Sequence, residues 1–186
     1  MSDERSKRKE QAWEGEARLT RSMPSRADPY VRFMREKMEK AGCAVHPEFF
    51  HVEMCDIKVG GGFRPEDGIV VCANHLHTQE DVDHAVTHEL IHAYDHCRAK
   101  TLDWNNCLHH ACSEIRAATL SGDCAFKQEL LRGNFGINKQ FQNCVKRRAL
   151  LSVNMNQACT GERAEHAVEE AFQKCFKYSE PFDRIP

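Results

Sequence analysis

The chain contains long stretches in which apolar residues recur every three or four positions. This recurrence predicts amphipathic helices, because positions three and four apart share one helix face. Asp28 and Thr78 are suited to cap the starts of the first two helices, and Gly42 to end the first. We predict helices over residues 29–40, 78–97, 104–121, 139–153 and 162–177.

Two segments with the pattern of strands precede the second helix. Residues 49–55 (FFHVEMC) alternate between apolar and polar positions, and residues 68–74 (GIVVCAN) form an apolar run, which indicates a more buried strand. We interpret Gly60-Gly61-Gly62, between them, as a turn. The order strand, strand, helix, helix predicts a small α+β domain that is mostly helical and built on a short sheet.

Composition narrows the class of protein. Hydrophobic residues make up 41% and charged residues 29%, as in globular domains. The net charge of −2 gives no electrostatic argument for binding nucleic acid. We find no apolar run long enough to span a membrane. Residues 1–27 are polar and predict a disordered lead, without the features of a secretory signal or a typical mitochondrial presequence. Residues 28–183 form the predicted folded domain.

Ten cysteines are many for a chain of 186 residues. None forms a C-x-x-C pair, so we predict a disulfide framework, with buried free thiols as the alternative. We expect Cys144, Cys159 and Cys175 to link the C-terminal helices to each other. Disulfides require an oxidising compartment, such as the mitochondrial intermembrane space. A cytosolic or nuclear interaction protein with reduced thiols remains the alternative.

Four histidines stand four residues apart in the predicted helix 78–97. Only His88 and His92 form the motif H-E-x-x-H, in which two imidazoles one turn apart can bind Zn²⁺. Glu89 is then placed to act as general base toward water at the metal. The row drifts by about 40° at each step, so His84 and His96 point about 120° apart and cannot share one metal. We place these two at the rim of the site or in solvent.

A catalytic zinc ion usually has three protein ligands and an open position. Glu114 is our first candidate for the third ligand, because it lies on the next predicted helix, 22 residues after His92. His110, one turn before Glu114, is an alternative ligand or an oxyanion donor. Asp95 is a further candidate ligand, or a residue that orients an imidazole. Together with the strand, strand, helix, helix order, these residues predict a small zincin-like zinc metallopeptidase domain stapled by disulfides.

Four segments resemble a known family. They are THELIHAYDHCR, DWNNCLHHACSEIRAATLSGDC, QNCVKRRALLSV and PFD, within residues 41–183, and they are similar to the mitochondrial inner-membrane metalloproteases and chaperones of ATP synthase assembly. On this chain the resemblance implies His88 and His92 as zinc ligands and Glu89 as the base, and it supports Glu114.

The resemblance also implies a cellular role. Members of this family are zinc endopeptidases of the intermembrane space, peripheral to the inner membrane. They remove the leader of the ATP synthase subunit 6 precursor and assist assembly of the membrane sector. The implied partner is therefore a protein substrate and not a nucleic acid. A non-proteolytic assembly chaperone with a structural or vestigial zinc site is the alternative.

Overall fold

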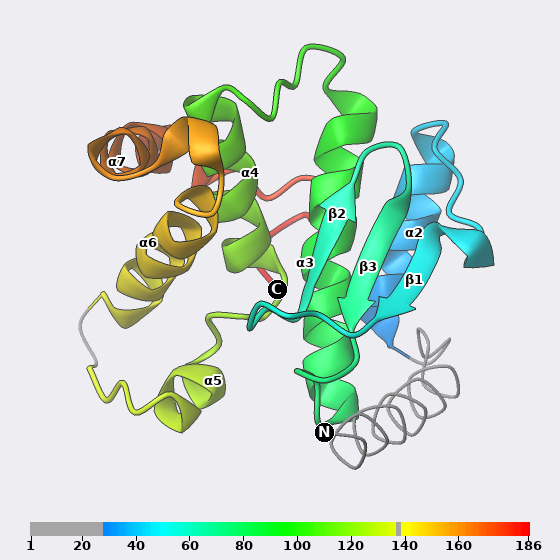
Figure 1. The fold of residues 1–186 in the computed structure, drawn as a ribbon, viewed down its shortest axis with the longest axis horizontal. Helices are drawn as coiled ribbons and strands as arrows, with labels where there is room; N and C mark the ends of the chain where they lie inside the picture. The colour runs from blue at the N-terminus through cyan, green and yellow to red at the C-terminus, as the bar shows by residue number, and fades with distance from the viewer. Residues whose placement is uncertain (1–27, 137–138) are drawn as a thin grey trace, which may run out of the picture. The chain divides into compact units, whose positions relative to one another are not determined.

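The computed structural model describes residues 28–136 and 139–186 (Figure 1). The predicted disordered lead, residues 1–27, lies outside these residues. The chain divides into two compact units, the first ending at Cys97 and the second running from Arg98 to Pro186. The predicted α+β class is confirmed, because helices predominate and a single short sheet is present in the described part.

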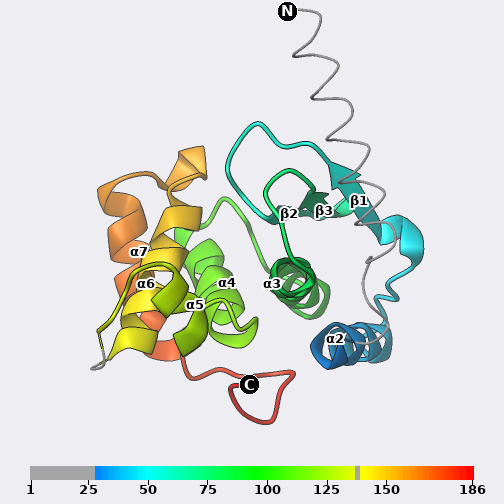
Figure 2. The same cartoon turned by 90° about the horizontal axis from the view of Figure 1, so that it is seen from below.

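The first unit combines two helices with a three-stranded sheet. The strands are β1 (Phe50–Glu53), β2 (Gly61–Arg64) and β3 (Gly68–Cys72), in the order β1-β3-β2. The central strand β3 is buried along its whole length and pairs parallel with β1 and antiparallel with β2. Helices α2 (Pro29–Lys40) and α3 (Gln79–Arg98) lie on the same face of this sheet (Figure 2).

Local capping explains where these two helices begin. The Asp28 side chain accepts hydrogen bonds from the first backbone N–H groups of α2, and Gly42, at φ +88°, follows its end. At the start of α3, the Asp81 N–H donates to Thr78 Oγ1 at 3.1 Å, and the Thr78 N–H donates to Asp81 Oδ2 at 2.9 Å. Partial burial raises the pKa of Asp81, but these hydrogen bonds outweigh it and hold the pKa below its ordinary value. Both predicted N-caps are confirmed.

The predicted turn at residues 60–62 is wrong. Gly61 and Gly62 begin β2 and lie opposite Val71 and Val70 of β3. A Cβ atom on Gly61 would lie 2.5 Å from the Val70 carbonyl oxygen, so a side chain does not fit there. Glycine therefore permits a close approach between strands at this position, where sequence reasoning assigned it to a turn.

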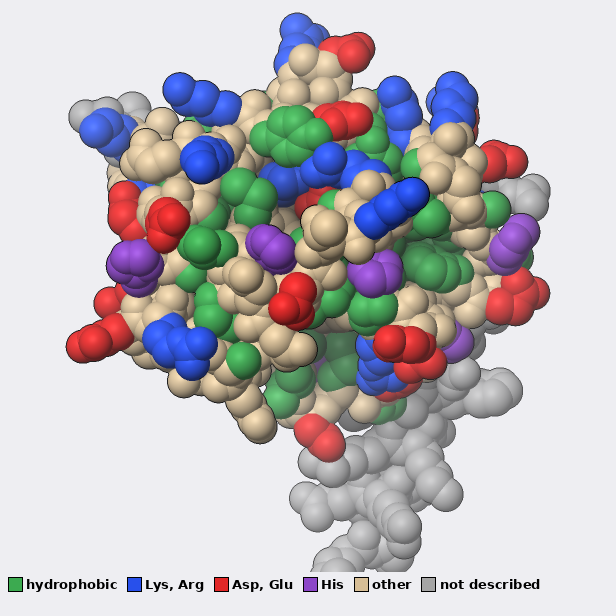
Figure 3. Space-filling view, turned by 90° about the horizontal axis from the view of Figure 1, so that it is seen from above, with side chains coloured by type: hydrophobic (Ala, Val, Ile, Leu, Met, Phe, Trp, Pro, Cys, Tyr) green, Lys and Arg blue, Asp and Glu red, His purple; other side chains and the backbone are tan. Residues whose placement is uncertain are grey.

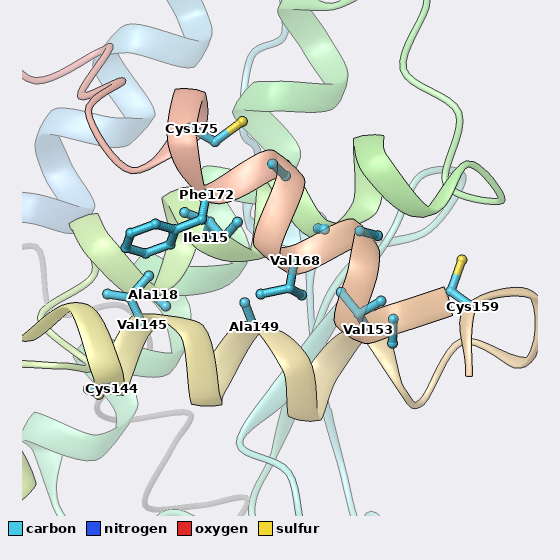
Figure 4. Packing of buried hydrophobic residues seen from close by; sticks show 14 of the residues in the cluster. Ile115, Ala118, Cys144, Val145, Ala149, Val153, Cys159, Val168, Phe172 and Cys175 are labelled. Carbon is cyan, nitrogen blue, oxygen red and sulfur yellow. The ribbon is translucent and has the colours of Figure 1, made fainter. Parts of the chain in front are cut away.

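The second unit is a helical bundle around one core. It contains α4 (Cys107–Leu120), α5 (Phe126–Leu131), α6 (Gln140–Val153), the short 3-10 helix η2 (Gln157–Cys159) and α7 (Glu162–Cys175). In Figure 4, Val168 and Phe172 of α7 point toward Ala149 of α6 and Ile115 of α4. Helix α4 begins three residues later than predicted, because the Asn106 side chain caps its first backbone N–H groups. The sequence patterns gave no prediction of α5.

All ten cysteines form disulfides, which confirms the predicted framework. The prediction that Cys144, Cys159 and Cys175 connect the C-terminal helices to each other is wrong. Each of the three pairs instead with a cysteine in residues 107–124. Helix α4 and the segment after it are thus the common anchor of the second unit. The pairs are Cys43–Cys97, Cys55–Cys72, Cys107–Cys159, Cys112–Cys175 and Cys124–Cys144.

A fully buried carboxylate holds α5 against α6. Glu129 accepts hydrogen bonds from Arg132 at 3.0 Å, Arg147 at 2.7 Å, Gln140 at 2.8 Å and Asn134 at 3.1 Å. Burial raises the pKa of Glu129, but these donors outweigh burial and hold the pKa below its ordinary value. The charge is compensated on several sides, as a buried carboxylate requires.

The distribution of charged side chains on the surface agrees with the nearly equal numbers of basic and acidic residues, 26 and 28. Acidic and basic side chains are intermingled over the face drawn in Figure 3. Within residues 28–136 and 139–186, no helix has both the length and the apolar character needed to cross a membrane.

Candidate metal centre

Helix α3 carries the H-E-x-x-H motif, with both histidines one turn apart on the same helix. The rings of His88 and His92 lie with their centroids 4.9 Å apart. His92 is 5% exposed and Glu89 7% exposed, so the middle of the motif is shielded from solvent. The regular helix therefore delivers two imidazoles and a carboxylate to one small region.

A third ligand candidate completes a group of metal-binding side chains. One ligand atom from each of His88, His92 and Glu114 lies within 4.8 Å of the other two. This is the one group of three such residues found in the described part of the chain, and it can hold a metal ion. Two imidazoles and one carboxylate are a donor set of catalytic zinc sites, so the residues present fit this metal.

The other sequence candidates occupy different positions. His110 Nε2 lies 3.3 Å from Glu114 Oε1, so His110 is next to the third ligand candidate and outside the group itself. Asp95 is buried, at 4% exposure, and also lies outside the group. His84 and His96 are half-buried and do not belong to it. The ring of His96 packs near that of Phe63, with centroids 5.7 Å apart.

Sequence reasoning missed one residue beside the motif. A Cβ atom on Gly61 would lie 3.4 Å from Glu89 Cγ and 3.7 Å from Glu89 Oε1. Strand β2 therefore passes directly beside the Glu89 side chain, and its glycine leaves space there. The signal in the sequence was the run of three glycines, which a turn explained equally well.

The comparison with known families decides the assignment. The model of the peptidase M76 family matches residues 16–183, which is most of the chain. The chain belongs to the peptidase M76 family. The predicted resemblance is confirmed, and the H-E-x-x-H helix and Glu114 both lie inside the matched region.

Relatives from animals and fungi extend the comparison. The mitochondrial inner membrane protease ATP23 homolog of Xenopus laevis is 48% identical over 85% of this chain and 68% of its own length. The human homolog is 46% identical over 86% of this chain and 65% of its own length. The mitochondrial inner membrane protease ATP23 of Mycosarcoma maydis is 40% identical over 86% of both chains. The chain thus spans about two thirds of the two vertebrate relatives. No solved structure matches it.

Proposed function

We propose that this M76 family member is a zinc metalloendopeptidase whose ion is held by His88, His92 and Glu114. The observation that carries the proposal is the grouping of these three donors around a motif that also contains a buried Glu89. When bound, zinc supplies a Lewis acid that polarises the peptide carbonyl and makes nearby water more acidic. A purely structural zinc site has no use for a carboxylate at this position, which favours hydrolysis.

Glu89 has the role of general base in this proposal. Its carboxylate accepts a proton from the attacking water and can deliver that proton to the amine that leaves when the peptide bond breaks. The side chain is held on a long, regular helix and is shielded from solvent, so its position is fixed before substrate binds. Gly61 leaves the space beside this carboxylate free of a side chain.

The proposed substrate is the precursor of ATP synthase subunit 6, from which the protein removes the leader. The proposed location is the intermembrane space, at the surface of the inner membrane. Two findings support this setting: relatives carry the name mitochondrial inner membrane protease, and all ten cysteines are paired in disulfides. Assistance in assembling the membrane sector of the ATP synthase is the second part of the proposed role.

Replacing Glu89 tests the peptidase activity. The variant Glu89→Gln preserves the size of the side chain but removes the base, so we expect kcat on a peptide spanning the leader junction to fall by about 10²-fold or more. The variant should retain its zinc content and its melting temperature. The matched control is Glu165→Gln, a change at an exposed position of α7, which should leave cleavage unchanged.

The outcome also separates the two candidate roles. Cleavage that persists at the wild-type rate in Glu89→Gln contradicts the proposed mechanism. If the wild-type protein cleaves no leader but still supports ATP synthase assembly, the protein is an assembly chaperone and its metal site is structural or vestigial.

A further inference from the structure

Asn156 lies far from Glu114 in the sequence but is connected to it by hydrogen bonds. Its Oδ1 accepts the Ala158 N–H at 3.0 Å, and its Nδ2 donates to the Trp104 carbonyl oxygen at 2.8 Å. These two backbone partners define which end of the amide is the nitrogen. The same Nδ2 lies 3.2 Å from His110 Nδ1.

This contact determines the tautomer of His110. An amide nitrogen donates hydrogen bonds and does not accept them, so His110 Nδ1 must be the acceptor and carry no proton. The neutral imidazole then has its proton on Nε2. Nε2 is the atom that lies 3.3 Å from Glu114 Oε1, so His110 donates to this carboxylate. The hydrogen bonds therefore run in one direction, from Asn156 to His110 to Glu114.

The surroundings hold this chain of hydrogen bonds in place. The disulfide Cys107–Cys159 ties the first turn of α4, which carries His110, to η2, which follows Asn156 directly. The Trp104 ring packs edge-to-face on the His110 ring, with centroids 5.9 Å apart. The side chains of His110 and Glu114 are only 15% and 9% exposed. Water therefore competes little for these bonds.

We propose that Asn156 and His110 are positioning residues for the Glu114 carboxylate. A hydrogen bond to Oε1 fixes the rotation of the carboxylate, which orients the lone pairs offered to a metal. This inference rests on the proposed function, in which Glu114 is a zinc ligand. Loss of such an outer hydrogen bond typically costs about 10–100-fold in metal affinity.

Asn154 provides a matched control two residues away. Its Oδ1 accepts the Gly161 N–H at 2.9 Å, and its Nδ2 donates to the Leu150 carbonyl oxygen at 2.9 Å. The exposed Asn154 and the half-buried Asn156 thus each accept one backbone N–H and donate to one backbone carbonyl, and Asn156 adds the contact with His110. The changes Asn154→Leu and Asn156→Leu each remove one accepted and one donated backbone hydrogen bond and add no charge. Only Asn156→Leu also removes the donor to His110 Nδ1, so that Nε2 is no longer held as the protonated nitrogen.

The experiment measures zinc affinity of the full, disulfide-intact chain by competition with a chelator. We expect Asn156→Leu to bind zinc about 10–100-fold more weakly than Asn154→Leu. In the metal-free protein, ¹⁵N shifts of the His110 ring should show the Nε2–H tautomer in wild type and Asn154→Leu, and a mixture with the Nδ1–H tautomer in Asn156→Leu. Equal zinc affinity of the two variants, or an Nδ1–H tautomer in wild type, overturns the inference.

Substitution of His110 itself provides an independent test if Asn156→Leu does not fold. Glutamine can place an N–H group where Nε2 stands, whereas leucine cannot. His110→Gln should therefore bind zinc at least about tenfold more tightly than His110→Leu. Equal affinities overturn the positioning role. A wild-type protein that binds no zinc overturns the proposed function itself, which makes the two failures distinguishable.

Discussion

A substitution at Gly61 tests the close packing of strand β2 against β3 and beside Glu89 of the motif helix. In Gly61→Ala, the new Cβ would lie 2.5 Å from the Val70 carbonyl oxygen, whereas ordinary van der Waals contact begins at 3.4 Å. Strand β2 must therefore move by roughly 0.9 Å or distort β3, and overpacking of this kind costs about 1–3 kcal/mol. The neighbouring Gly62 faces open space, with nothing within 4 Å of an added Cβ.

The assay compares Gly61→Ala with Gly62→Ala by thermal unfolding. We expect Gly61→Ala to melt roughly 2–12 °C below wild type, because 1 kcal/mol corresponds to about 2–4 °C in a chain of this size. Gly62→Ala should match wild type or gain up to about 1 kcal/mol, because alanine restricts the unfolded chain. Displacement of β2 beside Glu89 should also lower cleavage, by up to about 10²-fold. Equal melting temperatures of the two variants would refute the close packing described above.

Two further predictions concern the second unit. Glu129→Gln removes the buried charge that Arg132 and Arg147 contact, and should lower the free energy of unfolding by about 2 kcal/mol in urea at neutral pH. Because the pKa of Glu129 is lower in the folded than in the unfolded chain, its ionised form stabilises the fold above the unfolded pKa of about 4.5, and this stabilisation is lost as pH falls. If the difference in free energy of unfolding between wild type and Glu129→Gln grew in acid, this reasoning would be contradicted. Replacing Cys112 and Cys175 by alanine opens a disulfide of sequence separation 63 and should cost about 4 kcal/mol. An unchanged urea midpoint would show that this link adds no stability.

Local signals in the sequence were sufficient for most of the helices. Asp28, Thr78 and Gly42 act through hydrogen bonds or backbone angles within four residues, so their effect can be read along the chain. The motif helix was predictable for the same reason, because periodicity alone places His88 and His92 one turn apart.

Features that depend on contacts between distant segments were not predictable. Gly61 and Gly62 lie in β2, and the close approach of Gly61 to the Val70 carbonyl oxygen of β3, which leaves no room for a side chain, is not visible in the sequence. The pairing of Cys144, Cys159 and Cys175 depends on how three helices pack around α4. Asn156 could not be identified either, because its neighbour His110 lies 46 residues away.

The central claim is that His88, His92 and Glu114 hold zinc, and anomalous diffraction at the zinc absorption edge tests it most directly. In crystals of the full chain we expect one zinc peak about 2.0–2.2 Å from an imidazole nitrogen of each histidine and from a carboxylate oxygen of Glu114. The absence of a zinc peak, or a peak bound by His84 or His96 without these three residues, would contradict the claim.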